Sequence, residues 1–384
     1  MLKKDDFFKN YFIHSTQFKK NLKKTKVAFN SLLKKLKNNQ IPLFDSYQKN
    51  FEFDFSKSTV NKFSKYKNII IIGMGGSVLG TKSIYSFLRK KVKKEVFFFD
   101  NLDLNLIEKY KKIKKLKNSC FIVVSKSGNT LETITNLNAI FSKKNMKNKL
   151  IIITEIKDSS LMDFANKYNA EVIEHKEFIG GRYSVFSESG MFPAALMGLN
   201  LNKFRNLKTL IKNKNFISSL IQNVASIYTL NIKKINNSVI LNYNSSLNDL
   251  GYWYQQLTAE SLGKKGKGIN PVLSFGPKDH HSLLQLYLDG PKDKFFTFFN
   301  TSTKSNKKIE SIINIQCKAT KNIFRIKKIP YREFIFKNND ESELGSIFIF
   351  LVLETVLLSS LMNVNPYNQP AVEEVKVETK KFLR

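Results

Sequence analysis

Short apolar runs alternate with longer amphipathic stretches over the first half of the chain. Five runs have the length and composition of buried strands: NIIIIG (68–73), EVFFFD (95–100), CFIVVS (120–125), LIIITE (150–155) and EVIEH (171–175). Roughly 20 to 30 residues of helical pattern separate the start of one run from the start of the next, which is typical of βαβ units. The pattern therefore predicts an α/β domain built around a parallel sheet.

The same alternation begins again in the second half of the chain. SVILNYN (238–244) is predicted to be a strand, LNDLGYWYQQLTAESLG (247–263) a helix, and KFFTFFN (294–300) a further strand. The apolar segment IFIFLVLETVLLSSLM (347–362) is too short for a membrane span and carries Glu354 at its middle. We therefore expect it to be a buried core helix that packs against a second α/β domain.

The predicted fold class is α/β, with two tandem αβα sandwich domains whose sheets are mainly parallel. Polar amphipathic helices form an N-terminal segment, and a helical tail ends the chain. The predicted boundaries are 1–60 for the N-terminal segment, 61–204 for the first domain, 205–365 for the second domain and 366–384 for the tail.

Charge and cysteine content narrow the class of protein. A formal net charge of +33 could indicate nucleic-acid binding, but the basic residues are mostly lysines scattered along the chain, and only six are arginines. We interpret the charge as a compositional bias carried by solvated helix faces, although it could also attract a phosphorylated substrate. Cys120 and Cys317 form neither a disulfide framework nor a metal-binding spacing, and the start of the chain has no apolar run of signal-peptide length. We expect a cytoplasmic protein that binds neither nucleic acid nor a membrane.

The glycine-rich turn IIGMGGSVLG (71–80) joins a predicted strand to a predicted helix. Backbone N–H groups in such a turn can bind an anion, with help from the helix N-terminus. A dinucleotide fingerprint counted from Gly73 would need glycine where Val78 stands, and a P-loop counted from Gly75 would need GK[ST] where Gly80 is followed by Thr81-Lys82. Both cofactor motifs fail, which leaves an anion-binding turn or a tight packing turn.

A second polar turn follows the strand that ends at Val124. In SKSGNT (125–130), hydroxyl and amide groups gather at the carboxyl edge of the predicted sheet, where parallel α/β folds bind ligands. A serine or threonine before a helix is often only an N-cap, but five polar residues in six exceed what a cap requires. We expect this turn and GGS (75–77) to hold two sides of one phosphate group.

Three further stretches contain residues that could take part in catalysis. GGRYS (180–184) holds one of the few arginines, whose planar fork lysine cannot replace, and AESLGK holds Glu260 near the end of its predicted helix. GPKDHHSLLQLYLDGP (276–291) contains His280 and His281. Because neighbouring helical positions face different ways, at most one of these histidines should point into a site. His14 and His175 have no partner pattern and are interpreted as structural.

Taken together, these stretches resemble the phosphoglucose isomerase family, which is built from sugar-isomerase (SIS) domains. The resemblance spans roughly residues 68 to 378, in the order GMGGSVLG, SKSGNTLET, GGRYSVFS, AESLGK, GPKDHHS and NPYNQPAVEEVK. The first two motifs mark the wider class of phosphosugar-binding domains, and the others are specific to the family.

The resemblance implies a role for each matching position. Glu260 would be the general base, Arg182 would stabilise the charged intermediate, and His281 and Lys376 would assist ring opening. Glu132 would orient the histidine. The implied substrate and phosphate ligands are Gly76, Ser77, Ser125, the backbone of Lys126, Ser127, Thr130, Gly181 and Gln369.

The implied activity is the isomerisation of glucose 6-phosphate and fructose 6-phosphate through a cis-enediol, in glycolysis and gluconeogenesis, without metal or other cofactor. The implied assembly is a homodimer in which each subunit donates His281 to its partner's site.

Gly128-Asn129 and Val375 depart from the common family pattern, and the chain is short for the family. An isomerase with broader specificity (mannose 6-phosphate, for example) and a non-catalytic phosphosugar-binding protein remain alternatives. The second of these would not need Glu260, His281 and Lys376 together.

Overall fold

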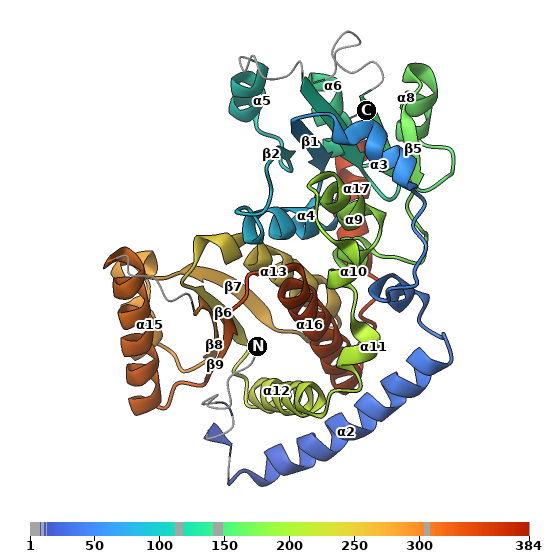
Figure 1. Cartoon of the computed structure of the whole chain (residues 1–384). Helices are drawn as coiled ribbons and strands as arrows, with labels where there is room; N and C mark the ends of the chain where they lie inside the picture. The colour runs from blue at the N-terminus through green and yellow to red at the C-terminus, as the bar shows by residue number, and fades with distance from the viewer. Residues whose placement is uncertain are drawn as a thin grey trace.

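The structure is a computed structural model that describes residues 8, 11, 12, 14–111, 118–140, 149–302 and 308–383. Its core is formed by two parallel sheets, one in each half of the chain, with helices packed around them (Figure 1). This arrangement confirms the predicted α/β class with two tandem sheet domains. The exact domain boundaries at residues 60, 204 and 365 stay a prediction.

The first sheet has five strands in the order β2-β1-β3-β4-β5. Every pairing is parallel, as the pattern of apolar runs predicts. The strands are β1 (Asn68–Gly73), β2 (Glu95–Phe99), β3 (Ser119–Val124), β4 (Leu150–Thr154) and β5 (Glu171–Glu174). All residues of β1, β3 and β4 are buried, which is why these strands are apolar without alternation. The helices of this half are α4 (Gly76–Phe87), α5 (Leu104–Lys111), α6 (Leu131–Ile140) and α8 (Ser160–Tyr168).

The second sheet has four parallel strands in the order β7-β6-β8-β9. They are β6 (Asn237–Asn242), β7 (Asn270–Phe275), β8 (Lys294–Thr301) and β9 (Tyr331–Phe336). The sequence pattern predicts β6 and β8 but does not predict β7 and β9. The associated helices are α12 (Lys214–Ile232), α13 (Asn248–Leu262), η5 (Lys278–His281), α14 (Leu284–Asp289), α15 (Lys308–Ile326) and α16 (Glu341–Met362).

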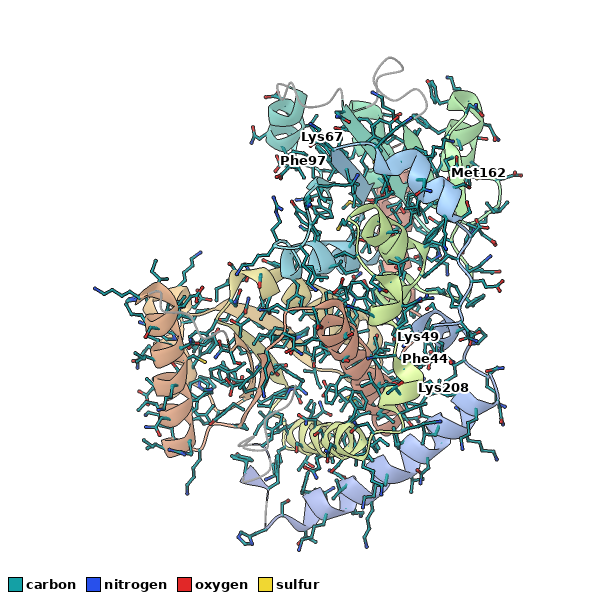
Figure 2. All side chains as sticks on the ribbon, in the orientation of Figure 1. Phe44, Lys49, Lys67, Phe97, Met162 and Lys208 are labelled. Atoms are coloured by element: carbon teal, nitrogen blue, oxygen red, sulfur yellow. The ribbon has the colours of Figure 1, made fainter. Side chains whose placement is uncertain are left out.

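Helices before, between and after the sheets complete the fold. The N-terminal segment contains α2 (Thr16–Lys37), η1 (Pro42–Tyr47) and α3 (Lys57–Ser64), and α2 packs on α12 and α16. The connection between the sheets contains η3 (Gly181–Phe186), α9 (Glu188–Leu196), α10 (Leu201–Phe204) and α11 (Leu207–Leu210). The tail forms α17 (Pro370–Phe382), as predicted. The lysines Lys49, Lys67 and Lys208, which Figure 2 labels, are exposed, in line with a net charge carried by solvated surface.

Helix α16 is the most apolar helix of the described chain and lies inside the protein. It is the one helix among the described residues with the length and hydropathy of a membrane span, and 83% of that apolar stretch is buried. Glu354 at its middle forms an ion pair with Arg332 of β9, and both side chains are 0% exposed. Tyr254 of α13 donates a hydrogen bond to Glu354 Oε1 at 2.9 Å. The prediction of a buried core helix is therefore confirmed, but the expectation that it is too short for a membrane span is wrong, because the helix begins at Glu341, before the apolar segment.

The two halves meet where α4 of the first half packs against α13 of the second (Figure 1). The ammonium of Lys82 on α4 lies 2.7 Å from Asp100, at the end of β2, and 3.9 Å from Asp249, in the first turn of α13. This contact fixes α13 next to the carboxyl edge of the first sheet.

Candidate active site

The glycine-rich turn between β1 and α4 lies against two other parts of the chain. A Cβ atom on Gly76 would lie 2.3 Å from the backbone carbonyl carbon of Gly181. A Cβ atom on Gly75, where φ is +51°, would lie 2.9 Å from Nε2 of Gln256. The backbone of Gly181 leaves no room for a side chain at position 76, and the positive φ favours glycine at position 75. Ser77 is half-buried in the first turn of α4, so the turn brings Gly76 and Ser77 next to the loop that carries Gly181.

The loop of residues 125–130 lies at the same edge of the sheet, because β1 and β3 are adjacent and parallel. Ser125 is buried, and its hydroxyl oxygen lies 2.8 Å from that of Thr130. Ser127 is exposed, and its Oγ accepts a hydrogen bond from the N–H of Asn129 at 3.3 Å. Helix α6 begins at Leu131, so its N-terminal N–H groups face the same loop. The loop therefore offers hydroxyl and backbone donors to an anion.

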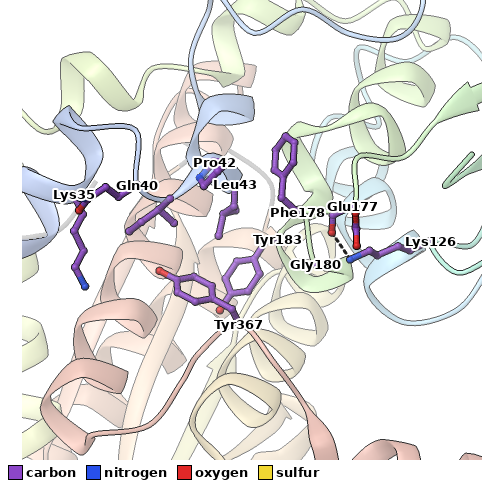
Figure 3. Close-up of a pocket in the computed structure, with 11 residues that line it drawn as sticks. Lys35, Gln40, Pro42, Leu43, Lys126, Glu177, Phe178, Gly180, Tyr183 and Tyr367 are labelled. Atoms are coloured by element: carbon purple, nitrogen blue, oxygen red, sulfur yellow. Dashed lines mark hydrogen bonds between the residues drawn. The ribbon is translucent and has the colours of Figure 1, made fainter.

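The side chain of Lys126 points away from this loop. Its ammonium donates a hydrogen bond to the carbonyl of Glu177 at 2.6 Å and lies 3.6 Å from the carboxylate of Glu155. Figure 3 shows it at one end of a cavity of about 540 Å³. Tyr183 and Tyr367 line the same cavity. Only the backbone of Lys126 is left to face a phosphate, which is the part of the residue that the family resemblance implicates.

Arg182, in η3, is the most heavily bonded cation of the site. Its side chain is 1% exposed. Its guanidinium donates to five acceptors: Ser261 Oγ (2.9 Å), Glu260 Oε2 (3.1 Å), Gln369 Oε1 (2.8 Å), the carbonyl of Asn368 (3.2 Å) and the carbonyl of Pro366. A buried guanidinium held in this way is a positive charge with a fixed position and orientation. The structure thus brings together three of the predicted site residues, Arg182, Glu260 and Gln369.

Glu260 lies near the C-terminal end of α13, and its side chain is 30% exposed. Its Oε2 accepts from Arg182, and its Oε1 accepts from Nε2 of Gln256 at 2.8 Å. Gln256 precedes Glu260 by four residues and so shares its face of the helix. The carboxylate is therefore oriented on both oxygens and still open to solvent.

Gln256 is a candidate site residue that the sequence analysis missed. The spacing of four residues from Glu260 on a predicted helix is the signal that could have found it. Its amide contacts both the carboxylate of Glu260 and the glycine-rich turn at Gly75, and its Oε1 is buried without a hydrogen-bond partner among the described residues. Gln256 links the second half of the chain to the proposed phosphate site.

The two adjacent histidines face different ways, as expected. His280 is half-buried, with Nε2 2.6 Å from the hydroxyl of Tyr243 and 3.3 Å from that of Thr320. Burial, and secondly the neighbouring His281, lower the pKa of His280. His281 is exposed and forms no hydrogen bond or ion pair with the described residues. Of the two, His281 is free to reach another molecule.

Within the described residues, Lys376 and Glu132 form no hydrogen bond or ion pair with Arg182 or Glu260. Lys376 is on the exposed helix α17, and its ammonium lies 2.6 Å from the carboxylate of Glu373. Glu132 is half-buried in the first turn of α6. Over the described ranges, no hydrogen bond or ion pair joins Lys376, His281 or Glu132 to Glu260. A single chain therefore assembles the Arg182–Glu260–Gln369 group but leaves the predicted ring-opening residues outside it.

A metal centre would need several ligands gathered at one place. Within the described part of the chain, no group of three or more His, Cys, Asp and Glu side chains could hold a metal ion.

Comparisons with known proteins show which family the chain is similar to. A family model of phosphoglucose isomerase matches residues 49–275. The chain is 32% identical over 373 residues to the glucose-6-phosphate isomerase of Methanocaldococcus jannaschii, and the alignment covers 91% of each protein. It is 27% identical over 347 residues to the glucose-6-phosphate isomerase of Campylobacter jejuni, with 83% of this chain and 85% of the relative covered.

Solved structures with the same fold agree with the two-sheet architecture. A crystal structure of a hypothetical protein from Thermus thermophilus superposes with a TM-score of 0.82 at 22% identity and covers 100% of both chains. A glucose-6-phosphate isomerase from Chlamydia trachomatis superposes with a TM-score of 0.71 at 19% identity, covering 85% of this chain and 71% of that one. At these identities the likeness concerns the fold alone.

Proposed function

The chain belongs to the phosphoglucose isomerase family, and from that membership we infer that it is an enzyme that interconverts glucose 6-phosphate and fructose 6-phosphate. One structural observation supports this inference and locates the proposed site. The buried guanidinium of Arg182 lies 3.1 Å from the partly exposed carboxylate of Glu260. A role in glycolysis and gluconeogenesis and a cytoplasmic location follow from this activity and are part of the proposal.

The isomerisation moves a proton between C2 and C1 of the open-chain sugar through a cis-enediol. One carboxylate on one face of the substrate can take the proton and return it, and Glu260 is the carboxylate proposed for this role. Its exposure gives substrate access to it, and its contacts with Gln256 and Arg182 fix its orientation. Negative charge that develops on the enediolate oxygens would be stabilised by Arg182, which is already oriented and needs no reorganisation.

The phosphate group is proposed to bind at the carboxyl edge of the first sheet. Gly76, Ser77, Ser125, Ser127 and Thr130 would supply hydroxyl and backbone donors, with the backbone of Lys126 and the N-termini of α4 and α6. Gly181 and Gln369 would line the sugar. Holding the phosphate at a distance from the reacting carbons would orient C1 and C2 against Glu260.

Ring opening requires a proton donor at the ring oxygen and an acceptor at the anomeric hydroxyl. His281 and Lys376 are proposed for these roles, and Glu132 is proposed to orient the histidine. His281 is exposed and forms no hydrogen bond or ion pair with the described residues, which supports a homodimer in which it reaches the site of the partner subunit.

A coupled assay of the purified protein tests the function. With fructose 6-phosphate as substrate and no added metal, we expect formation of glucose 6-phosphate, and Glu260→Gln protein is the matched control. Comparable turnover of mannose 6-phosphate would favour an isomerase of broader specificity. Tight binding of either sugar phosphate without turnover would instead indicate a non-catalytic phosphosugar-binding protein.

Mixed dimers test whether His281 is shared between subunits. Chains carrying Glu260→Gln and His281→Ala, each with a different affinity tag, are coexpressed and the mixed dimer is isolated. If His281 serves the partner's site, one of the two sites is intact, and activity should reach about half that of wild type.

The control is the reciprocal mixed dimer, in which one chain carries both substitutions and the other chain is wild type. With a shared His281, each of its sites has one defect and the dimer should be nearly inactive. The opposite pattern, an active control and an inactive test dimer, would place His281 in its own chain's site.

A further inference from the structure

The segment of residues 362–369, here called the C-terminal strap, connects the end of α16 to the start of α17. Its carbonyl groups accept hydrogen bonds from cations of two other parts of the chain. Lys267 Nζ donates to Met362 O at 2.9 Å, and Lys264 Nζ donates to Asn365 O at 2.5 Å. Arg182 then binds the last residues of the strap, through the carbonyls of Pro366 and Asn368 and the side chain of Gln369. Side-chain cations therefore hold the strap along its length.

The two lysines that hold the strap come from one tight turn, KKGKG (264–268). Lys264 N–H donates to Lys267 O at 3.1 Å and Lys267 N–H donates to Lys264 O at 2.9 Å, so the two residues form an antiparallel bridge. Residues that face each other in such a bridge project their side chains to the same side. This geometry directs both ammonium groups at the strap.

Lys264 has a second partner that ties the strap to the candidate base. Its ammonium also donates to the carbonyl of Ser261 at 3.0 Å, in the last turn of α13. Ser261 directly follows Glu260. The last carbonyls of a helix lack intrahelical partners and attract cations. Lys264 therefore bridges the helix end that carries Glu260 and the strap that carries Gln369.

The helix beyond the strap has little else to hold it. No residue of α17, Pro370–Phe382, is buried, and this helix carries Lys376. Burial, and secondly the charge of Arg182, lower the pKa of Lys264 to about 8, while Glu260 acts in the opposite direction. The surroundings of Lys264 therefore disfavour its charged form. The hydrogen bonds to the carbonyls of Ser261 and Asn365 offset part of that free-energy cost.

We propose that Lys264 is a positioning residue that locks the C-terminal strap to α13, so that Gln369 and the helix carrying Lys376 are held in register with Glu260. It does not contact the reacting atoms. The catalytic part of this inference rests on the proposed isomerase function, whereas the mechanical part, that Lys264 restrains the strap, does not.

Lys264→Met removes the ammonium and keeps most of the side-chain stem. We expect kcat with fructose 6-phosphate at pH 7 to fall by about tenfold, the order expected when reacting groups lose alignment, and KM to change less, because the phosphate loops are untouched. Lys264→Arg retains the charge and the donors and should recover most of the lost kcat. Lys265→Met, an exposed neighbour in the same turn, is the matched control and should behave as wild type.

Amide hydrogen exchange of peptides covering residues 363–376 gives a readout that does not depend on activity. We expect faster exchange there in Lys264→Met than in Lys265→Met, with unchanged exchange in the strands of both sheets. Equal exchange in the two variants, or wild-type kcat in Lys264→Met, would overturn the proposal. A wild-type protein without isomerase activity would refute the proposed function, and the exchange comparison would still decide whether Lys264 restrains the strap. If Lys264→Met does not fold, Lys264→Gln takes its place with the same expectations.

Discussion

The Arg182–Glu260 pair and the Arg332–Glu354 pair use the same two residue types in opposite surroundings. Helix α13 contributes to both, through Glu260 in one and through Tyr254 in the other. Arg182 is 1% exposed beside a carboxylate that is 30% exposed, whereas Arg332 and Glu354 are both 0% exposed. The two regions differ in access to the carboxylate.

This difference in exposure distinguishes a candidate catalytic ion pair from a structural one. Both oxygens of Glu354 are occupied by Arg332, and one of them also by Tyr254, so no substrate can reach the carboxylate. Burial alone would lower the pKa of Arg332, but Glu354 and Tyr254 together raise it, so the guanidinium stays charged in the core. Glu260 is oriented by its neighbours but remains open. Exposure of the carboxylate, more than the identity of its partner, indicates which pair can do chemistry.

Glu260→Gln should give the largest loss of activity in the comparison. We expect kcat to fall by about 10²-fold or more, the loss typical of a positioned general base, with little change in substrate affinity. Stability should fall less than in Glu354→Gln, because Glu260 is partly exposed, so the charge it neutralises is partly solvated, and Arg182 keeps four other acceptors: Ser261, Pro366, Asn368 and Gln369. Steady-state kinetics and thermal unfolding of the same preparation measure both quantities. Near-normal turnover would assign the base to another residue.

Glu354→Gln should reverse that pattern. The substitution leaves the guanidinium of Arg332 buried without a counter-charge, which typically costs about 3–5 kcal/mol of unfolding free energy. Denaturant unfolding measures the loss, and kcat per folded molecule should be unchanged. Glu378→Gln removes a surface ion pair with Lys381 and serves as the control, with an expected loss within a few tenths of a kcal/mol. A Glu354→Gln protein as stable as this control would show that the core pair is dispensable.

Arg182→Lys should give the smallest of the three effects and is the sharpest test of geometry. A lysine retains the charge but cannot donate to the acceptors that the guanidinium fork reaches together. We expect kcat to fall roughly tenfold, measured with fructose 6-phosphate, with a modest loss of thermal stability. If the variant is almost fully active, a diffuse positive charge is sufficient at this position, and the fixed guanidinium has no special role.

The sequence pattern predicts the first sheet closely, and it predicts the second only in part, for physical reasons. Strand β9 contains Arg332 and Glu333, both buried, whose partners Glu354 and Lys321 are supplied by α16 and α15. Hydrophobicity cannot reveal a buried strand whose charges are neutralised by other elements. Strand β7 begins with Asn270-Pro271 and lies at the edge of its sheet, where proline is tolerated and the apolar signal is weak.

The candidate site was predictable where it depends on local motifs. Arg182, Glu260 and Gln369 were expected from their motifs, and the structure brings them into contact. The parts that were not predicted depend on the meeting of distant segments. Gln256 contacts the candidate site because Gly75 lies against its side chain. Lys264 can bind the strap because the strap passes over the end of α13. The roles of His281 and Lys376 stay predictions, since a single chain leaves both exposed.

Lys376 is connected to the rest of the molecule by the chain more than by packing, because no residue of its helix is buried. A group attached in this way acts as a tethered reagent, whose effective concentration depends on the length and stiffness of the tether. The strap is short and bonded along its length, which corresponds to a stiff tether and a high effective concentration wherever α17 is directed. Loosening the strap would dilute Lys376 without altering its chemistry, so the rate could be tuned from residues that never touch the substrate.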